Sequence, residues 1–320
     1  MKQAPLGQCG LQVSRVCLGT MLFGSSCDES GAHRIMDVAI ELGIDFFDVA
    51  NSYPSPPDPE TMGRSEEMVG RWLKGRRHDI VLSTKFGSKF QALLGNRRDV
   101  IQACEASLRR LQTDYIDIYW FHQATLETPF EETLEALDRL VQAGKVLYIG
   151  ASNFETWHLA LLLMAAVGRP STRVVAIQPR YNLLCRQSER DLIPLAAAAG
   201  LGVVPFNPLG GGVLSGRYAA SAEPPVESRF AWGEFGQSYR RRYWSEDAFA
   251  TAEVVKRVAG RQGITPSQVA VAWLLSRRGV TSAIVGASKP DQLRDSAAGA
   301  NLALSTESVS ELDEASRQFI

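Results

Sequence analysis

The chain has 320 residues, of which 45% are hydrophobic, and a formal net charge of −1. That balance of charge gives no electrostatic reason to expect a nucleic acid or an anionic membrane as partner. Its five cysteines are irregularly spaced without a CxxC pair, so neither a disulfide framework nor a zinc site is expected. The sequence has no apolar signal core and no apolar run of about eighteen residues, and we therefore expect a cytoplasmic protein that does not span a membrane.

Short apolar segments alternate with helical periodicities along the chain. After a hairpin within residues 3–18, we expect strands at 13–18, 44–47, 80–84, 115–121, 146–149, 174–177, 202–206 and 281–285. The expected helices are 29–42, 65–73, 99–111, 129–143, 156–167, 189–199, 246–262, 266–277, 290–298 and 306–318. Residues 215–244 are marked by Gly and Pro and show no clear period, which predicts a long loop that is either functional or a linker.

Eight strands that mostly alternate with helices favour parallel pairing through crossover helices. The length and the strand count predict an α/β fold, a single (β/α)8 TIM barrel domain over residues 1–320, with an N-terminal β-hairpin and additional C-terminal helices. The alternative is an open doubly wound sheet, which ordinarily carries a GxGxxG turn after its first strand. The sequence has no such motif, and its Gly210-Gly211-Gly212 run follows the seventh strand.

Most expected strands end in a polar or aromatic residue. In a barrel these carboxyl ends meet at one rim, which is where barrel enzymes place their active sites. The rim residues are Asp48, Lys85, His122, Ser152, Asn153, Gln178, Phe206 and Ser288. Asp48 alone could be a turn cap. The recurrence of such residues at strand after strand favours a functional site.

The residues at this rim indicate acid catalysis. Lys85 near Asp48 would form a buried ion pair, and its ammonium beside Tyr53 would lower the phenol pKa from about 10. Tyr53 with His122 as a neighbour could protonate a carbonyl oxygen. The sequence has no metal-binding motif and no GxSxG, so we expect a cofactor to carry the chemistry, with hydride transfer the natural case.

Several segments resemble one family in order and spacing. They read LGTMLFG, GIDFFDVANSY, LSTKFG, DYIDIYWFH, GKVLYIGASNF, IQPRYNLLCR, PFNPLGGGVLSGRY and IVGASKPDQLRDSAA. Over essentially its whole length the chain resembles the aldo-keto reductases, (β/α)8 barrels that bind NADPH or NADP+ across the barrel mouth and reduce aldehydes and ketones. The resemblance implies a catalytic tetrad of Asp48, Tyr53, Lys85 and His122, with Tyr53 as proton donor.

The resemblance also implies a set of cofactor contacts. These are Gly19, Thr20, Met21, Asp48, Ser152, Asn153, Gln178, Phe206, Asn207, Leu209, Gly211, Arg217, Arg229, Gly286, Ser288, Lys289, Gln292 and Asp295. Phe206 replaces a common Tyr and keeps its capacity for stacking. Arg217 replaces a common Lys, and Asp295 stands where Glu is usual. Lys289 is the candidate for the 2′-phosphate, its alternative being a solvated rim lysine.

The expected partner is a small-molecule carbonyl compound. Its pocket would include Tyr53, Trp120, His122 and Trp232, although Trp120 could equally belong to the core. The Pro-rich segment 54–64 is expected to form one wall, or else is a tolerated insertion. Both a monomer and a homo-oligomer are compatible with the family. The segment GASKPDQL also resembles the potassium-channel beta-subunit branch, which gives the alternative of a cofactor-binding regulatory subunit with little turnover.

Overall fold

A computed structural model describes residues 1–88, 95–169, 172–220 and 222–320. It contains a two-stranded antiparallel hairpin and an eight-stranded parallel sheet. The hairpin consists of β1 (Gln3–Pro5) and β2 (Gln12–Ser14). The parallel strands are β3 (Val16–Gly19), β4 (Phe46–Asp48), β5 (Val81–Phe86), β6 (Ile116–Phe121), β7 (Val146–Ser152), β8 (Val174–Gln178), β9 (Gly202–Val203) and β10 (Ala283–Gly286).

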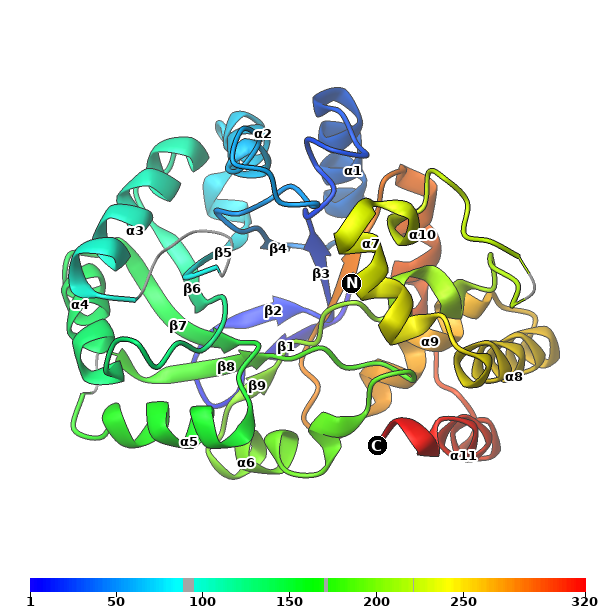
Figure 1. Ribbon diagram of the computed structural model, residues 1–320. Coiled ribbons are helices and arrows are strands. Elements are labelled where there is room, and N and C mark those ends of the chain that lie inside the picture. Colours follow the sequence, from blue (N-terminus) through cyan, green and yellow to red (C-terminus); the bar gives the residue numbers. More distant parts are fainter. Residues whose placement is uncertain (89–94, 170–171, 221) are drawn as a thin grey trace.

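The parallel sheet closes on itself. Its strand order is β10-β3-β4-β5-β6-β7-β8-β9, and parallel bridges from Val203 to Val280 and from Phe206 to Ile284 join the two ends. Across this seam the Thr281 amide donates to the Val203 carbonyl over 2.8 Å. The predicted (β/α)8 barrel is therefore confirmed, and the open sheet is excluded. Figure 1 shows the strands curling around a common centre with the helices outside.

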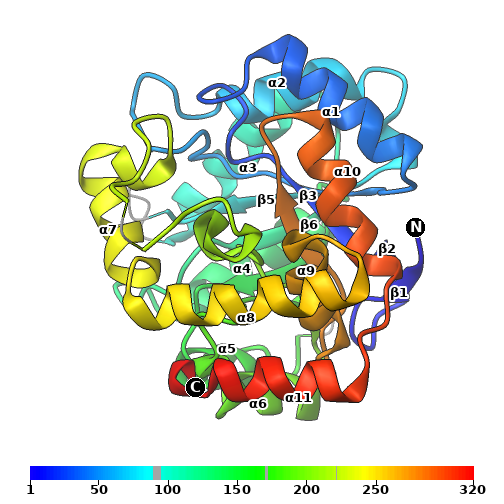
Figure 2. The ribbon, with the colours of Figure 1, turned by 90° about the vertical axis from the view of Figure 1, so that its right-hand side faces the viewer.

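The helices form the outer layer of the barrel. They are α1 (Glu29–Glu41), α2 (Arg64–Leu73), α3 (Arg97–Leu111), α4 (Phe130–Gln142), α5 (Thr156–Ala165), α6 (Leu192–Ala198), α7 (Gly233–Tyr243), α8 (Glu246–Gln262), α9 (Pro266–Ser276), α10 (Pro290–Ala298) and α11 (Thr306–Ala315). Local signals set their ends, as in α9, where Thr265 and Gln268 form a capping box with Pro266 at the first turn. Figure 2 shows α8 and α11 side by side outside the barrel.

The hairpin covers one end of the barrel, where Leu6 and Val13 join the apolar interior with Phe46, Ile118 and Trp120. A Cβ on Gly7 would lie 2.5 Å from the Gly202 amide nitrogen, so this close approach requires glycine. With that end filled, the opposite end, where the parallel strands terminate, is left for a site.

One predicted segment differs in the structure. Residues 215–244 were expected to be a loop, yet α7 occupies 233–243 of them. Two glycines and three consecutive arginines in α7 obscure its periodicity, although Phe235, Tyr239 and Tyr243 recur at helical spacing. Among the helices that the structure describes, none is long and apolar enough to cross a membrane.

Candidate active site

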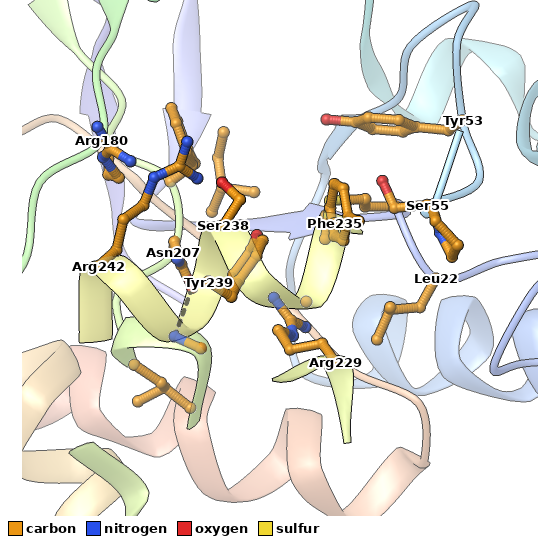
Figure 3. Close-up of a pocket in the computed structure, with 18 of the residues that line it drawn as sticks. Leu22, Tyr53, Ser55, Arg180, Asn207, Arg229, Phe235, Ser238, Tyr239 and Arg242 are labelled. Carbon is orange, nitrogen blue, oxygen red and sulfur yellow. Dashed lines mark hydrogen bonds between the residues drawn. The ribbon is translucent and has the colours of Figure 1, made fainter. Parts of the chain in front are cut away.

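A cavity of about 1060 Å³ opens at the carboxyl ends of the strands. Its walls come from the segments after all eight parallel strands, and α7 lies over it. Figure 3 shows Tyr53 facing this space opposite Phe235 and Tyr239 of α7. The Pro-rich segment contributes Pro56 and Pro57 to the lining, so its beginning forms part of the wall, as the first interpretation of that segment predicted.

Asp48 and Lys85 form a buried ion pair below the cavity. Their side chains are 2% and 1% exposed, and Lys85 Nζ lies 2.5 Å from Asp48 Oδ2. The ammonium also donates to the Val49 carbonyl over 2.6 Å, while Asp48 Oδ1 accepts from Ser83 Oγ and Gln178 Nε2, each at 2.9 Å. Burial, the largest single effect, would lower the pKa of Lys85, but its interactions with Asp48 and Tyr53 together outweigh burial and the pKa is raised. Lys85 therefore stays charged.

Tyr53 stands directly above this ion pair. Lys85 Nζ donates to Tyr53 Oη over 3.3 Å and lies 4.8 Å from the centre of its ring. Burial nevertheless raises the pKa of the Tyr53 phenol, and the opposing effect of Lys85 does not overcome it. The prediction of a lowered pKa is wrong for this structure, because desolvation of the phenolate exceeds its attraction to the ammonium. Tyr53 is thus a neutral phenol with a proton to give.

His122 completes the group at the base of the cavity. Its ring meets that of Tyr53 edge to face, with centroids 6.1 Å apart. Burial, and after it the charge of Lys85, lowers the pKa of His122 to about 3, so the imidazole is neutral near pH 7. In this state one ring nitrogen donates a hydrogen bond and the other accepts one. His122 can therefore orient a substrate oxygen, while Tyr53 is the better acid.

The three amide and hydroxyl residues predicted from the ends of β7 and β8 form a chain. Asn153 Nδ2 donates to Ser152 Oγ over 3.0 Å and to the His122 carbonyl over 2.8 Å, and Ser152 Oγ donates to the Gln178 carbonyl over 2.9 Å. Asn153 and Gln178 line the cavity. Ser152 is buried and supports Asn153 from behind. Through its bond to Asp48, Gln178 also links this group to the ion pair, a contact that the sequence did not reveal.

The loop after β9 has the form of an anion cradle. Gly211 and Gly212 have φ values of 71° and 103°, and a Cβ on Gly211 would lie 2.9 Å from Phe230 Cζ. The Gly211 amide donates to Asn207 Oδ1 over 2.9 Å, which fixes the loop. Arg217 and Arg229 line the same cavity. Backbone turned by glycines beside two guanidinium groups suits a phosphate chain, so these residues fit a dinucleotide.

Other predicted contacts also reach the cavity. They are Gly19, Met21, Phe206, Asn207, Leu209, Trp232, Gly286, Ser288 and Gln292.

Besides Lys85 and Ser152, four predicted site residues do not line the cavity. Trp120 is fully buried in the barrel interior, because β6 turns it inward against β7, so its expected place in the pocket is wrong. Asp295 accepts hydrogen bonds from Thr265 and Gln268 over 2.7 and 3.2 Å and thus supports the start of α9, and its contact with the cofactor stays a prediction. Thr20 is buried, and its hydroxyl donates to the Asp48 carbonyl. Lys289 is exposed just before α10.

Several residues that line the cavity were not expected from the sequence. Arg180 follows Gln178 by two residues, and Phe235 and Ser238 come from α7. The alternation of a strand was the available signal for Arg180, since residues two apart face the same side. The aromatic spacing of α7 was the signal for the others.

Comparison with known proteins identifies the family. The model of the aldo/keto reductase family matches residues 15–317. The chain belongs to the aldo/keto reductase family. Members of this family are oxidoreductases that act on carbonyl compounds and generally use nicotinamide cofactors.

Several relatives align with this aldo/keto reductase over nearly all of its length. The uncharacterized oxidoreductase YrpG of Bacillus subtilis is 35% identical, covering 96% of this chain and 93% of the relative. A probable voltage-gated potassium channel subunit beta of Arabidopsis thaliana is 32% identical, covering 92% and 90%. The L-glyceraldehyde 3-phosphate reductase of Escherichia coli O157:H7 is 31% identical, covering 96% and 90%.

Proposed function

We propose that this aldo/keto reductase uses NADPH to reduce an aldehyde or a ketone to the alcohol, with Tyr53 as the proton donor. One observation carries the proposal: the buried pair of Lys85 and Asp48 supports a protonated Tyr53, beside a neutral His122, in a cavity that also holds an anion cradle. The name of one relative denotes the reduction of an aldehyde, which agrees with this reaction.

Each residue at the base of the cavity has a distinct part in the proposed reaction. The bound nicotinamide supplies the hydride. Tyr53 Oη delivers the proton to the carbonyl oxygen, and the ammonium of Lys85 stabilises the phenolate that this transfer leaves behind. Asp48 holds that ammonium in place. A ring N–H of His122 donates to the carbonyl oxygen and fixes its direction.

The same cavity has groups to hold the cofactor. Asn153 and Gln178 present amide groups that can bind the nicotinamide carboxamide, and Arg217 and Arg229 suit the pyrophosphate. Lys289 lies at the start of α10, where Pro290 is the first helical residue. An ammonium and a helix N-terminus together favour a phosphate, and on this basis we propose NADPH over NADH.

The first experiment measures turnover of NADPH and of NADH with a panel of aldehydes, ketones, quinones and keto-sugars. The loss of absorbance of the reduced nicotinamide reports the rate. We expect Tyr53→Phe to retain NADPH binding and to lose kcat by roughly 10²-fold or more, because general acid catalysis contributes about that factor. Tyr115→Phe, a change at a tyrosine that does not line the cavity, is the matched control and should keep full activity.

The outcomes of this experiment separate the two functions considered. Wild-type turnover in Tyr53→Phe would refute its role as the acid. Tight NADPH binding without turnover on any carbonyl compound would favour the regulatory alternative, which the potassium channel subunit among the relatives motivates.

A further inference from the structure

Two arginines meet in the cavity from different parts of the fold. Arg180 follows β8, and Arg242 lies in the last turn of α7. Both line the cavity, and Figure 3 shows their guanidinium groups side by side. Arg180 is half-buried, while Arg242 is at the exposed rim. Arg180 is near enough to Arg242 to act on its charge, and two like charges placed together raise the question of which group neutralises them.

No described carboxylate answers this question. Within the described residues, neither guanidinium lies within 4.0 Å of an Asp or Glu oxygen, and Arg180 Nε is buried without a hydrogen-bond partner. Two other arginines nearby in the sequence do have a carboxylate partner: Arg186 pairs with Glu189 at 2.8 Å, and Arg240 pairs with Glu223 at 3.3 Å. Partial burial, and after it the charge of Arg180, lowers the pKa of Arg242. The pair is thus a concentrated positive charge that an incoming anion would relieve.

The position of the pair relates it to the reacting end of the cavity. Arg180 is two residues beyond Gln178, whose amide donates to Asp48 over 2.9 Å. Two residues of extended chain span roughly 7 Å. The backbone of Arg180 also forms an isolated β-bridge with that of Phe206. A small substrate whose carbonyl lies at Tyr53 can therefore extend toward Arg180.

The pair is separate from the cradle assigned to the pyrophosphate. Arg242 and Arg229 lie near the same ring, with their guanidinium carbons 6.0 and 5.3 Å from the centre of Tyr239. Figure 3 shows them on different sides of this ring, with Arg180 beside Arg242. Tyr239 thus stands between two positively charged regions, one at the cradle and one on the side of Gln178.

We propose that Arg180 and Arg242 form an anion-binding subsite for the substrate, so that the carbonyl compound reduced by this enzyme carries a carboxylate or a phosphate. The proposal rests on the proposed reductase function and extends it to the class of substrate. A planar guanidinium can bind two oxygens of such a group at once. The half-buried Arg180 would fix the anion, and Arg242 would cover it from the rim.

The test compares two substrates of similar shape, of which one carries a negative charge and the other does not: para-carboxybenzaldehyde and its methyl ester. We expect the wild type to favour the acid, and Arg180→Gln and Arg242→Gln each to lower kcat/KM for the acid about 10-fold or more, the scale of a lost charge-assisted contact. In both variants, kcat/KM for the ester and the KM for NADPH should stay within about 2-fold of the wild-type values. Arg241→Gln, a change in the exposed arginine next along α7, is the matched control and should alter neither substrate.

Other results would overturn the subsite. An equal loss on acid and ester would give the arginines a structural role, and a raised KM for NADPH would assign the anion to the cofactor. Binding of benzoate to the enzyme with NADP+, measured by calorimetry, requires no turnover. Benzoate affinity that is the same in the wild type and in Arg180→Gln would refute the subsite. Absence of turnover across the whole carbonyl panel would refute the reductase function, and the benzoate experiment would still decide the subsite.

Discussion

At the scale of single residues, burial and charge act in opposite directions on the site. For Lys85 the interactions with Asp48 and Tyr53 together prevail over burial and the ammonium persists, whereas for Tyr53 burial prevails and the phenol keeps its proton. Among the described residues, no carboxylate offsets the effects of burial and Lys85 on His122, and its pKa falls to about 3. One ion pair therefore yields a fixed cation, a neutral acid and a neutral donor within a small volume.

These pKa shifts predict a simple pH dependence for carbonyl reduction. A proton donor is active below its pKa, so the raised pKa of Tyr53 keeps kcat/KM constant through neutral pH and lets it fall only above about 10. His122 becomes charged only toward pH 3, so no step in kcat/KM should occur between about pH 5 and 9. Initial rates of NADPH oxidation across this range test the prediction. Histidine ordinarily has a pKa of about 6.5. A step in kcat/KM near that pH would contradict the prediction if the step disappeared in His122→Asn.

The sequence predicted which residues converge, because strand ends of a parallel barrel meet at one rim. It did not predict the direction of the pKa shift at Tyr53. That direction depends on how deeply the phenol is enclosed, and α7 and the Pro-rich segment help to enclose it. Neither segment had a clear structure at the level of sequence pattern. Trp120 was ambiguous for a related reason, since a strand turns alternate residues inward and outward and only the register decides between them.

At the scale of elements, α7 is the part of the fold that shapes the pocket. It presents Phe235, Tyr239 and Arg242 to the cavity. Two hydrogen bonds fix its last turns: Asn207 Nδ2 donates to Tyr243 Oη over 3.0 Å, and Arg240 Nε donates to the Phe230 carbonyl over 2.9 Å. The bond to Tyr243 connects α7 to the loop that carries the anion cradle. A change in how α7 packs against the barrel should therefore affect ligand binding as well as stability.

Gly236 is the position at which the packing of α7 against Phe230 can be tested. A Cβ there would lie 2.7 Å from the Phe230 carbonyl oxygen, so Gly236→Ala must push α7 outward. We expect a loss of about 1–3 kcal/mol in the free energy of unfolding, the range for overpacking, and a several-fold rise in KM for carbonyl substrates. Urea denaturation and steady-state kinetics measure the two effects.

Gly260 of α8 supplies the matched control for Gly236. A Cβ on Gly260 meets nothing within 4 Å, and Gly260→Ala should stabilise the protein by about 0.5–1 kcal/mol through helix propensity without altering KM. If both substitutions had the same effect on KM, the contact of α7 with Phe230 would not govern the pocket.

At the scale of the whole molecule, the barrel depends on a seam between the start and the end of the chain. Strand β3 pairs with β10 along Val16–Gly19, and the other edge of β10 meets the segment around β9 through isolated bridges alone. The alternating pattern predicted eight parallel strands in a closed barrel. It could not predict how the ring closes, because closure depends on hydrogen bonds between residues far apart in the sequence.

Arg15 is the residue that fastens this seam. Its Nη1 donates to the carbonyls of Val280 and Thr281 over 2.6 and 3.0 Å, and its Nη2 donates to that of Leu275 over 2.5 Å. Arg15→Met keeps the aliphatic stem but leaves these acceptors without the guanidinium, so we expect the free energy of unfolding to fall by roughly 2–4 kcal/mol. The exposed Arg278, changed to Met, should shift it by less than about 0.5 kcal/mol. Equal urea midpoints for Arg15→Met and the wild type would mean that strand pairing alone closes the barrel.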